Sequence, residues 1–136
     1  MCACYFRAQG EDFDVDEFLS CSPWQANASV KRKGEAKSRG NRLREYSSFT
    51  LTVTGDDSAT VAQQVSACRS FIRAHADELH RLHAQSAVQA RYFSLAYYLP
   101  IGEVYAIGPY FESDFLSDLV SIGAEFEFNV FCTSVE

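Results

Sequence analysis

The longest regular pattern of apolar side chains covers residues 60–85. Apolar or weakly polar residues recur there at alternating steps of four and three, which is the spacing of one helix face. They are Val61, Val65, Cys68, Ile72, His75, Leu79 and Leu82. At about 1.5 Å per residue such a helix would be about 40 Å long. The pattern therefore predicts one long helix that crosses most of the sheet made by the rest of the chain.

Strands are predicted where apolar and polar side chains alternate. The clearest covers residues 48–54, in which Phe49, Leu51 and Val53 point to one face and serine and threonine side chains to the other. Further strands are expected at residues 2–8, 27–33, 91–99, 104–107 and 125–133.

A short helix is expected to begin after Asp14. Asp14 can cap it with Glu17 at the third helical position, and Phe13 and Phe18 can form a hydrophobic staple across the cap. Pro23 ends this helix, because proline cannot continue the helical hydrogen-bond pattern.

The acids at the start of this helix allow a second interpretation. Asp12, Asp14 and Asp16 copy the opening of a calcium-binding loop. Such a loop needs a glycine where Glu17 stands and a bidentate glutamate where Pro23 stands. The motif fails at both positions, and acids at a helix N-terminus already offset the positive end of the helix dipole.

Two further helix signals complete the order of elements. Thr60 and Gln63 form a second candidate capping box, and Ser113 can cap a third helix that ends at Gly123. The order is therefore three successive β-α-β units. We expect a single α+β domain over residues 1–136, a two-layer sandwich with one mostly antiparallel or mixed sheet of about six strands packed against one long and two short helices.

Length and hydropathy narrow the class of protein. With 136 residues the chain suits one domain with a core, and no apolar run approaches the ~18 residues needed to span a membrane. The first residues lack the charged and apolar regions of a signal peptide, so we expect a cytoplasmic protein. Tyr5, Tyr92 and Tyr98 are predicted on the outer strand faces, where they suggest a homodimer through an aromatic sheet face.

Charge is distributed unevenly along a chain whose net charge is −6. Residues 31–44 carry seven lysines and arginines against one acid, Glu35, whereas residues 100–136 carry seven acids and no lysine or arginine. Such a chain either closes its charged ends on each other or presents two opposite faces to partners.

Several stretches taken together resemble a known bacterial family. They are Phe13-Asp-Val-Asp-Glu-Phe-Leu19, Arg32-Lys-Gly-Glu35, Ser48-Phe-Thr-Leu-Thr-Val53, the helix residues Gln64, Phe71, Leu79 and Leu82, and the tail Gly123-Ala-Glu-Phe-Glu-Phe-Asn-Val-Phe131. They resemble the family called domain of unknown function 4279 (DUF4279) over nearly the whole chain. The resemblance implies no activity and no catalytic residues. At family level it suggests a link to toxin–immunity systems.

Histidines and cysteines supply the candidate metal ligands. His80 and His83 share a helix face, so they could bind zinc with Asp77 or Glu78 if further ligands were present. The alternative is that they place positive charge at the helix C-terminus. His75 lies on the apolar stripe and is expected to be a buried, hydrogen-bonded histidine.

The five cysteines contain no C-x-x-C pair, so they are interpreted as small buried hydrophobes. Cys2 and Cys4 keep a metal site open as an alternative, since both could lie on one strand face. Cys21 is expected to be a buried cap of the short helix. The sequence contains no nucleophile elbow, dinucleotide-binding loop or phosphate-binding loop, which argues against the enzyme classes that use them. No cofactor is implied.

The basic segment is the main candidate interaction site. We expect it to contact a partner through Trp24, Lys31, Arg32, Lys33, Arg42 and Arg44. The favoured hypothesis is a non-catalytic protein-interaction module, which could be an immunity-type inhibitor of another protein. The alternatives are a small metal- or ligand-dependent enzyme that uses His80 and His83, and a weak nucleic-acid binder. A solvated loop without function is the fourth interpretation.

Overall fold

The computed structural model describes residues 4–56, 59–100, 102 and 110–133. These residues form five strands and four helices, so the α+β class is confirmed. In chain order they are β1 (Cys4–Gly10), α1 (Val15–Ser20), β2 (Ser29–Lys31), β3 (Ser47–Thr54), α2 (Val61–Ala74), α3 (Ala76–His83), β4 (Ala90–Pro100), α4 (Ser113–Ser121) and β5 (Glu125–Thr133).

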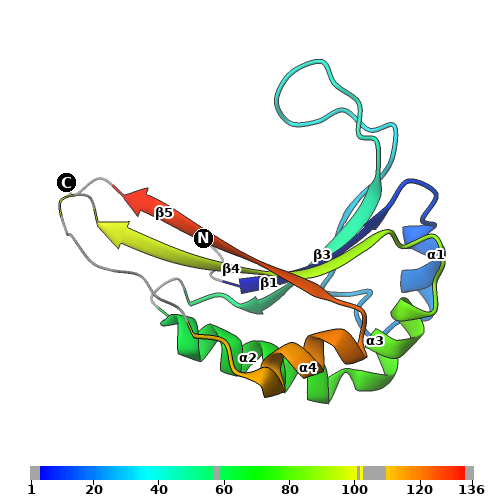
Figure 1. Cartoon of the computed structure of the whole chain (residues 1–136). Helices are drawn as coiled ribbons and strands as arrows, with labels where there is room; N and C mark the ends of the chain where they lie inside the picture. The colour runs from blue at the N-terminus through cyan, green and yellow to red at the C-terminus, as the bar shows by residue number, and fades with distance from the viewer. Residues whose placement is uncertain (1–3, 57–58, 101, 103–109, 134–136) are drawn as a thin grey trace.

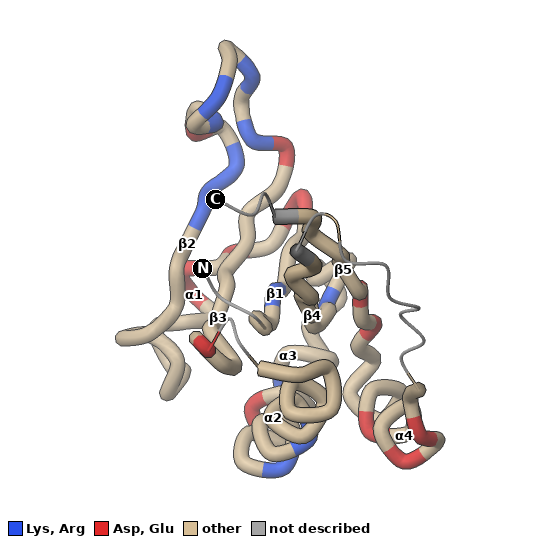
Figure 2. The backbone as a smooth tube through the Cα atoms, turned by 90° about the vertical axis from the view of Figure 1, so that its left-hand side faces the viewer, with Lys and Arg blue, Asp and Glu red and all other residues tan. Residues whose placement is uncertain are grey.

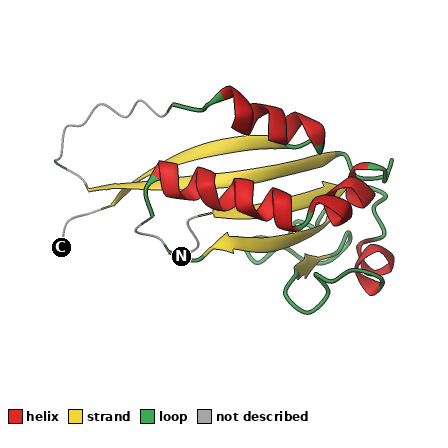
Figure 3. Ribbon diagram, turned by 90° about the horizontal axis from the view of Figure 1, so that it is seen from below, coloured by secondary structure: helices red, strands yellow, loops and turns green. Residues whose placement is uncertain are grey.

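The strands form one mixed sheet in the order β2-β3-β1-β4-β5. Neighbours are antiparallel except β4 and β5, which are parallel and are connected through α4. The sheet has five strands rather than about six, and the strand expected at residues 104–107 lies outside the described residues. Figures 1 and 3 show α2, α3 and α4 against one face of the sheet, while no described helix covers the other face. We call that second face the open face.

Large aromatic side chains fill the space between the sheet and the helices. Phe6, Phe49 and Phe93, from three neighbouring strands, are fully buried. Trp24 and Phe71 pack on these three rings from the helix side. The ring centroids of Trp24 and Phe71 are 6.0 Å from each other. A second group joins α4 to β5, where the rings of Phe111 and Phe126 are 4.7 Å apart and those of Phe115 and Phe126 are 5.8 Å apart.

The prediction of one long helix at residues 60–85 is wrong, because the chain leaves helical geometry at His75. This residue has φ −118° and ψ 24° and separates α2 from α3. Its Nδ1 atom accepts a hydrogen bond of 3.2 Å from Nε1 of Trp24. The apolar stripe survives the break, since Cys68 and Ile72 of α2 and Leu79 and Leu82 of α3 are all buried.

The helix starts follow local sequence signals. The Asp14 side chain accepts from the backbone N–H of Glu17, which is one of the two hydrogen bonds of the predicted capping box. The rings of Phe13 and Phe18 are 5.9 Å apart, as the staple predicts. Thr60 and Gln63 form a complete capping box on α2.

The third helix differs from its prediction at the N-terminus and in two side chains expected to face inward, since Leu116 and Val120 are exposed. The N-cap of α4 is Glu112, so Ser113 is its first residue. Gly123 follows the end of α4 with φ 62°, a left-handed conformation that favours glycine, as expected.

Gln64 connects α2 to β4 through a buried side-chain amide. Its Oε1 accepts from the backbone N–H of Ala96 (3.0 Å), and its Nε2 donates to the carbonyl of Ala96 (2.5 Å) and to that of Ala59 (3.1 Å). The described pairing of β1 with β4 ends at Leu95. At Ala96, the next residue of β4, the side-chain amide of Gln64 therefore makes the hydrogen bonds that a paired strand would make. No helix in the described part of the chain is long and apolar enough to cross a membrane.

Candidate functional site

Residues 32–46 form an ordered extension between β2 and β3, which we call the basic hairpin. Backbone hydrogen bonds join its two sides, from Gly34 to Arg44 (2.9 Å), from Arg44 to Glu35 (2.8 Å) and from Lys37 to Arg42 (3.0 Å). Figure 1 shows that it projects from the edge of the sheet, on the side opposite the helices. Gly40 turns the chain near the tip with φ 84°.

Ion pairs attach the base of the hairpin to α1 and to the turn that follows β1. Arg32 donates to Asp16 through both Nε and Nη2, each at 2.8 Å, and Lys33 lies 3.5 Å from Glu11. The guanidinium of Arg32 lowers the pKa of the Asp16 carboxyl, and the carboxylate raises the pKa of Arg32. Arg32 and Lys33, two of the predicted contact residues, therefore use their charges within the molecule.

The tip of the hairpin carries cations with no internal counterion. Lys37, Arg39 and Arg42 are exposed, and none of them makes an ion pair with another residue that the structure describes. Figure 2 shows the basic positions along the hairpin and the acidic positions of α4 at the far end of the molecule. Of the two outcomes expected from the charge distribution, the chain thus presents two oppositely charged regions.

Two further cations flank a buried serine on the open face of the sheet. Lys31 lies opposite Ser48 in the β2–β3 register, and Nη2 of Arg7 donates to Oγ of the same serine at 3.3 Å. Burial, followed by the charges of Arg44 and Arg7, lowers the pKa of Lys31. The Nε atoms of Arg7 and Arg44 are both buried without a hydrogen-bond partner among the described residues.

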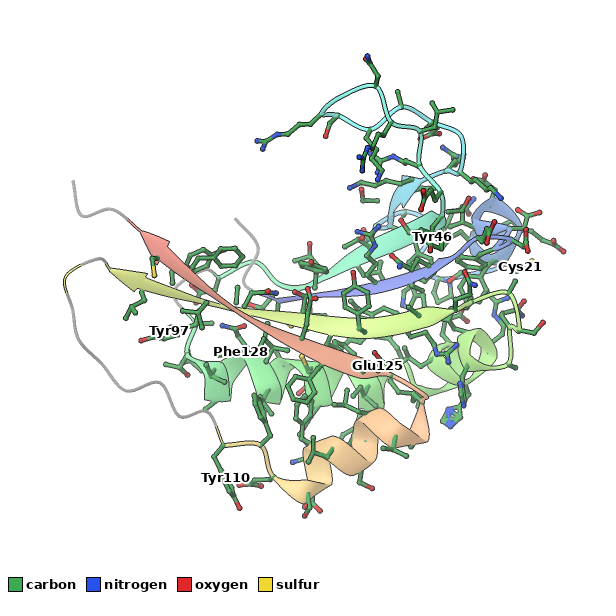
Figure 4. All side chains as sticks on the ribbon, turned by 45° about the horizontal axis from the view of Figure 1, so that its top comes forward. Cys21, Tyr46, Tyr97, Tyr110, Glu125 and Phe128 are labelled. Carbon is green, nitrogen blue, oxygen red and sulfur yellow. The ribbon has the colours of Figure 1, made fainter. Side chains whose placement is uncertain are left out.

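Trp24 lies in the core, apart from the candidate surface. It is 3% exposed, and its ring packs against Phe6, Phe18, Phe49 and Phe71. A surface partner cannot reach this side chain in the folded protein. Tyr46, 42% exposed, is the aromatic residue at the base of the hairpin (Figure 4).

The two candidate metal-binding histidines have separate surroundings. Nδ1 of His80 donates to the carbonyl of Ala76 at 2.8 Å, whereas the ring of His83 lies against Gly123. In the described ranges no three His, Cys, Asp or Glu side chains come together to hold a metal. The helix-terminal alternative accounts for both positions, since His80 and His83 lie in the last turn of α3.

A cavity of about 460 Å³ lies between α2 and α4. Val61, Val65 and Phe115 form its apolar wall, and Arg73 and Glu112 lie at its border. Tyr110, 85% exposed, stands near the start of α4 (Figure 4). Arg69 pairs with Asp118 at 3.0 Å and joins the two helices beside the cavity. These groups show no arrangement of base and nucleophile.

The family model described as domain of unknown function (DUF4279) matches residues 1–133. The chain belongs to the DUF4279 family. Neither the comparison with curated proteins nor that with solved structures found a match. Membership in DUF4279 agrees with the stretches that carry the resemblance, and it assigns no activity to the site described above.

The structure adds residues to the candidate site that the sequence did not single out. Arg7 joins Lys31 and Arg44 only because β1 pairs with β3 in the middle of the sheet. The one sequence signal for Arg7 was its position on the outward face of the strand predicted at residues 2–8. Lys37 and Arg39 belong to the basic run, and the hairpin places both near Arg42 at its tip.

Proposed function

We propose that this DUF4279 protein is a non-catalytic protein-interaction module that binds an acidic surface of another protein through the basic hairpin. The observation that carries the proposal is the difference between the cations at the base of the hairpin and those at its tip. Arg32 pairs with Asp16 of α1 and Lys33 with Glu11 of the turn after β1, so both cations hold the base of the hairpin. Lys37, Arg39 and Arg42 have no counterion among the described residues. An ordered extension that presents free cations suits electrostatic recognition of an acidic partner.

The net charge favours a protein partner over nucleic acid. The chain as a whole carries −6, and its acidic residues would repel a long polyanion that extended beyond the hairpin. Trp24, the only tryptophan, is buried and unavailable for base stacking. Inhibition of the partner by stoichiometric binding would make the protein an immunity-type inhibitor, the specific form suggested by the family-level link.

Affinity capture from a nuclease-treated cell extract tests the proposal. The bait is compared with a variant carrying Lys37→Gln, Arg39→Gln and Arg42→Gln, which leaves the ion pairs at the base intact. Arg73→Gln on α2 is the matched control for loss of one exposed arginine. We expect one stoichiometric protein with the wild type and the control, and at least about tenfold weaker binding by the triple variant. Equal capture by all three proteins would contradict a hairpin site, and no capture by any would contradict the interaction module.

The homodimer through the aromatic sheet face is a second proposal. Tyr5, Tyr92 and Tyr98 are half-buried, and Tyr98 stacks on Phe131 with ring centroids 5.4 Å apart. Phe131 is 47% exposed. Light scattering at several protein concentrations, repeated with Phe131→Ser, tests whether this end of the sheet carries a dimer contact. A concentration-independent monomer mass would contradict it.

A further inference from the structure

Three cations around the open face lack the ion pairs that neutralise four other cations of the described structure. Ion pairs neutralise Arg32, Lys33, Arg69 and Arg81. In the described structure no carboxylate pairs with Arg7, Lys31 or Arg44, which come from β1, β2 and the basic hairpin. Like charges held near one another raise the free energy of the folded state unless a counter-charge is present.

The hydrogen-bonding groups of these cations are also incompletely used. Nη2 of Arg7 donates to Ser48 Oγ at 3.3 Å, and Ser48 itself is 1% exposed. The Nε atoms of Arg7 and Arg44 lie out of contact with solvent, and none of the described residues accepts from them. Buried donors without acceptors are rare in folded proteins, because burial removes the hydrogen bonds that water would make to them.

Two carboxylates of β5 lie in the rows next to these cations. Glu125 lies opposite Tyr92, which lies opposite Arg7, and Glu127 lies in the next row, opposite Ser94. Glu127 accepts from Ser94 Oγ at 2.7 Å and from Asn129 Nδ2 at 3.2 Å. Both acids are two strands away from β1, and neither forms an ion pair with Arg7, Lys31 or Arg44 in the described structure.

We propose that Arg7, Lys31 and Arg44 form a binding site for the phosphate group of a small molecule on the open face, at the foot of the basic hairpin. A phosphate carries close to two negative charges and offers three acceptor oxygens, which suits three cations better than a single carboxylate does. Guanidinium groups bind such oxygens through parallel N–H donors. Tyr92 lies directly across from Arg7 and adds a phenol beside the group. The site is separate from the hairpin tip on which the proposed function depends.

The test is a titration of the isolated protein with inorganic phosphate and with pyrophosphate at constant ionic strength. The readout is the arginine Nε–Hε signals in ¹H–¹⁵N spectra, assigned with Arg7→Lys and Arg44→Lys. We expect saturable shifts of these two signals. In Lys31→Gln the Kd should rise about tenfold, whereas the matched tip variant Lys37→Gln should keep it within about twofold.

Three results would overturn the site. They are shifts that do not saturate, equal shifts of the tip arginines Arg39 and Arg42, and an unchanged Kd in Lys31→Gln. The wild-type spectra decide the first two, so the proposal stays testable even if a β1 variant does not fold. The titration contains no partner protein. A negative result would therefore refute the phosphate site without bearing on the proposed function.

Discussion

The Sγ atoms of Cys4 and Cys68 lie 3.2 Å apart at the place where β1 meets α2. Both side chains are fully buried, and the hydrogen bond with Cys68, together with burial, raises the pKa of the Cys4 thiol. Only thiolates react readily, so these two cysteines should be protected in the folded protein. Cys21 and Cys132, which are exposed, should be alkylated by iodoacetamide much faster.

Mass mapping of the labelled peptides checks this expectation. Labelling of Cys4 and Cys68 should become fast only in denaturant. Native-state labelling of either at the rate of Cys21 would contradict the buried contact. Cys21 is the C-cap of α1 as expected, but the expectation that it is buried is wrong, because its side chain is exposed.

Gln64→Ala should destabilise the protein by about 2–4 kcal/mol, because it leaves the N–H and the carbonyl of Ala96 without partners in the core. Gln64→Glu keeps the acceptor and loses the donor, so it should also destabilise. Urea unfolding followed by Trp24 fluorescence measures both changes. Gln25→Ala, at an exposed glutamine, is the matched control and should stay within about 0.5 kcal/mol of the wild type. Equal stability of Gln64→Ala and the control would refute the role of the amide.

Gly123→Ala should destabilise the fold through two separable effects. The left-handed backbone, with φ 62°, costs a residue with a Cβ about 1–2 kcal/mol. The new Cβ would also meet the ring of His83, so part of the cost should disappear in a His83→Ala background. Gly55→Ala is the control, since a Cβ there meets no atom within 4 Å. Thermal unfolding of Gly123→Ala, His83→Ala, the double variant and Gly55→Ala separates the backbone cost from the steric cost. An identical cost of Gly123→Ala in both backgrounds would show that the His83 ring moves freely.

The attachment of the hairpin to α1 should depend on acid pH. Arg32 lowers the pKa of Asp16 below its ordinary value of 3.8. The ion pair therefore contributes fully above that value and is lost as the pH falls through the lowered pKa of the folded state. NMR titration should show the hairpin amides of Ala36 and Leu43 shifting together with the Asp16 carboxyl.

Asp16→Asn should shift the hairpin amides already at neutral pH. Asp12→Asn, at an exposed acid with no ion pair among the described residues, should not. Unchanged hairpin amides in Asp16→Asn would mean that the backbone bonds alone fix the orientation of the hairpin.

Local signals in the sequence predicted more of this structure than long-range ones. The caps at Asp14 and Thr60 need only residues three positions apart, and both are present. The break at His75 coincides with a hydrogen bond from Trp24, which is 51 positions away and reaches the helix only in the folded chain. No pattern within residues 60–85 could show it.

The candidate site, too, was predictable only where it depends on local sequence. The basic run is visible in the sequence, but the roles of its members are set by what lies across from them in space. Arg32 pairs with Asp16 of α1, whereas Lys31 lies opposite Ser48, to which Arg7 of β1 donates. A one-dimensional pattern treats these cations as equivalent, whereas the fold assigns one to internal attachment and the other to the open face.

The central position of β1 has a consequence for how the chain acquires its fold. Cys4 pairs with Thr54 of β3 on one side and with Leu95 of β4 on the other. The middle strand therefore cannot complete its pairing until these later parts of the chain have been synthesised. Such distant pairings raise the contact order and slow folding. Until β4 emerges from the ribosome, β1 exposes an unpaired edge and the apolar face of Phe6, which makes the nascent chain a candidate client for chaperones.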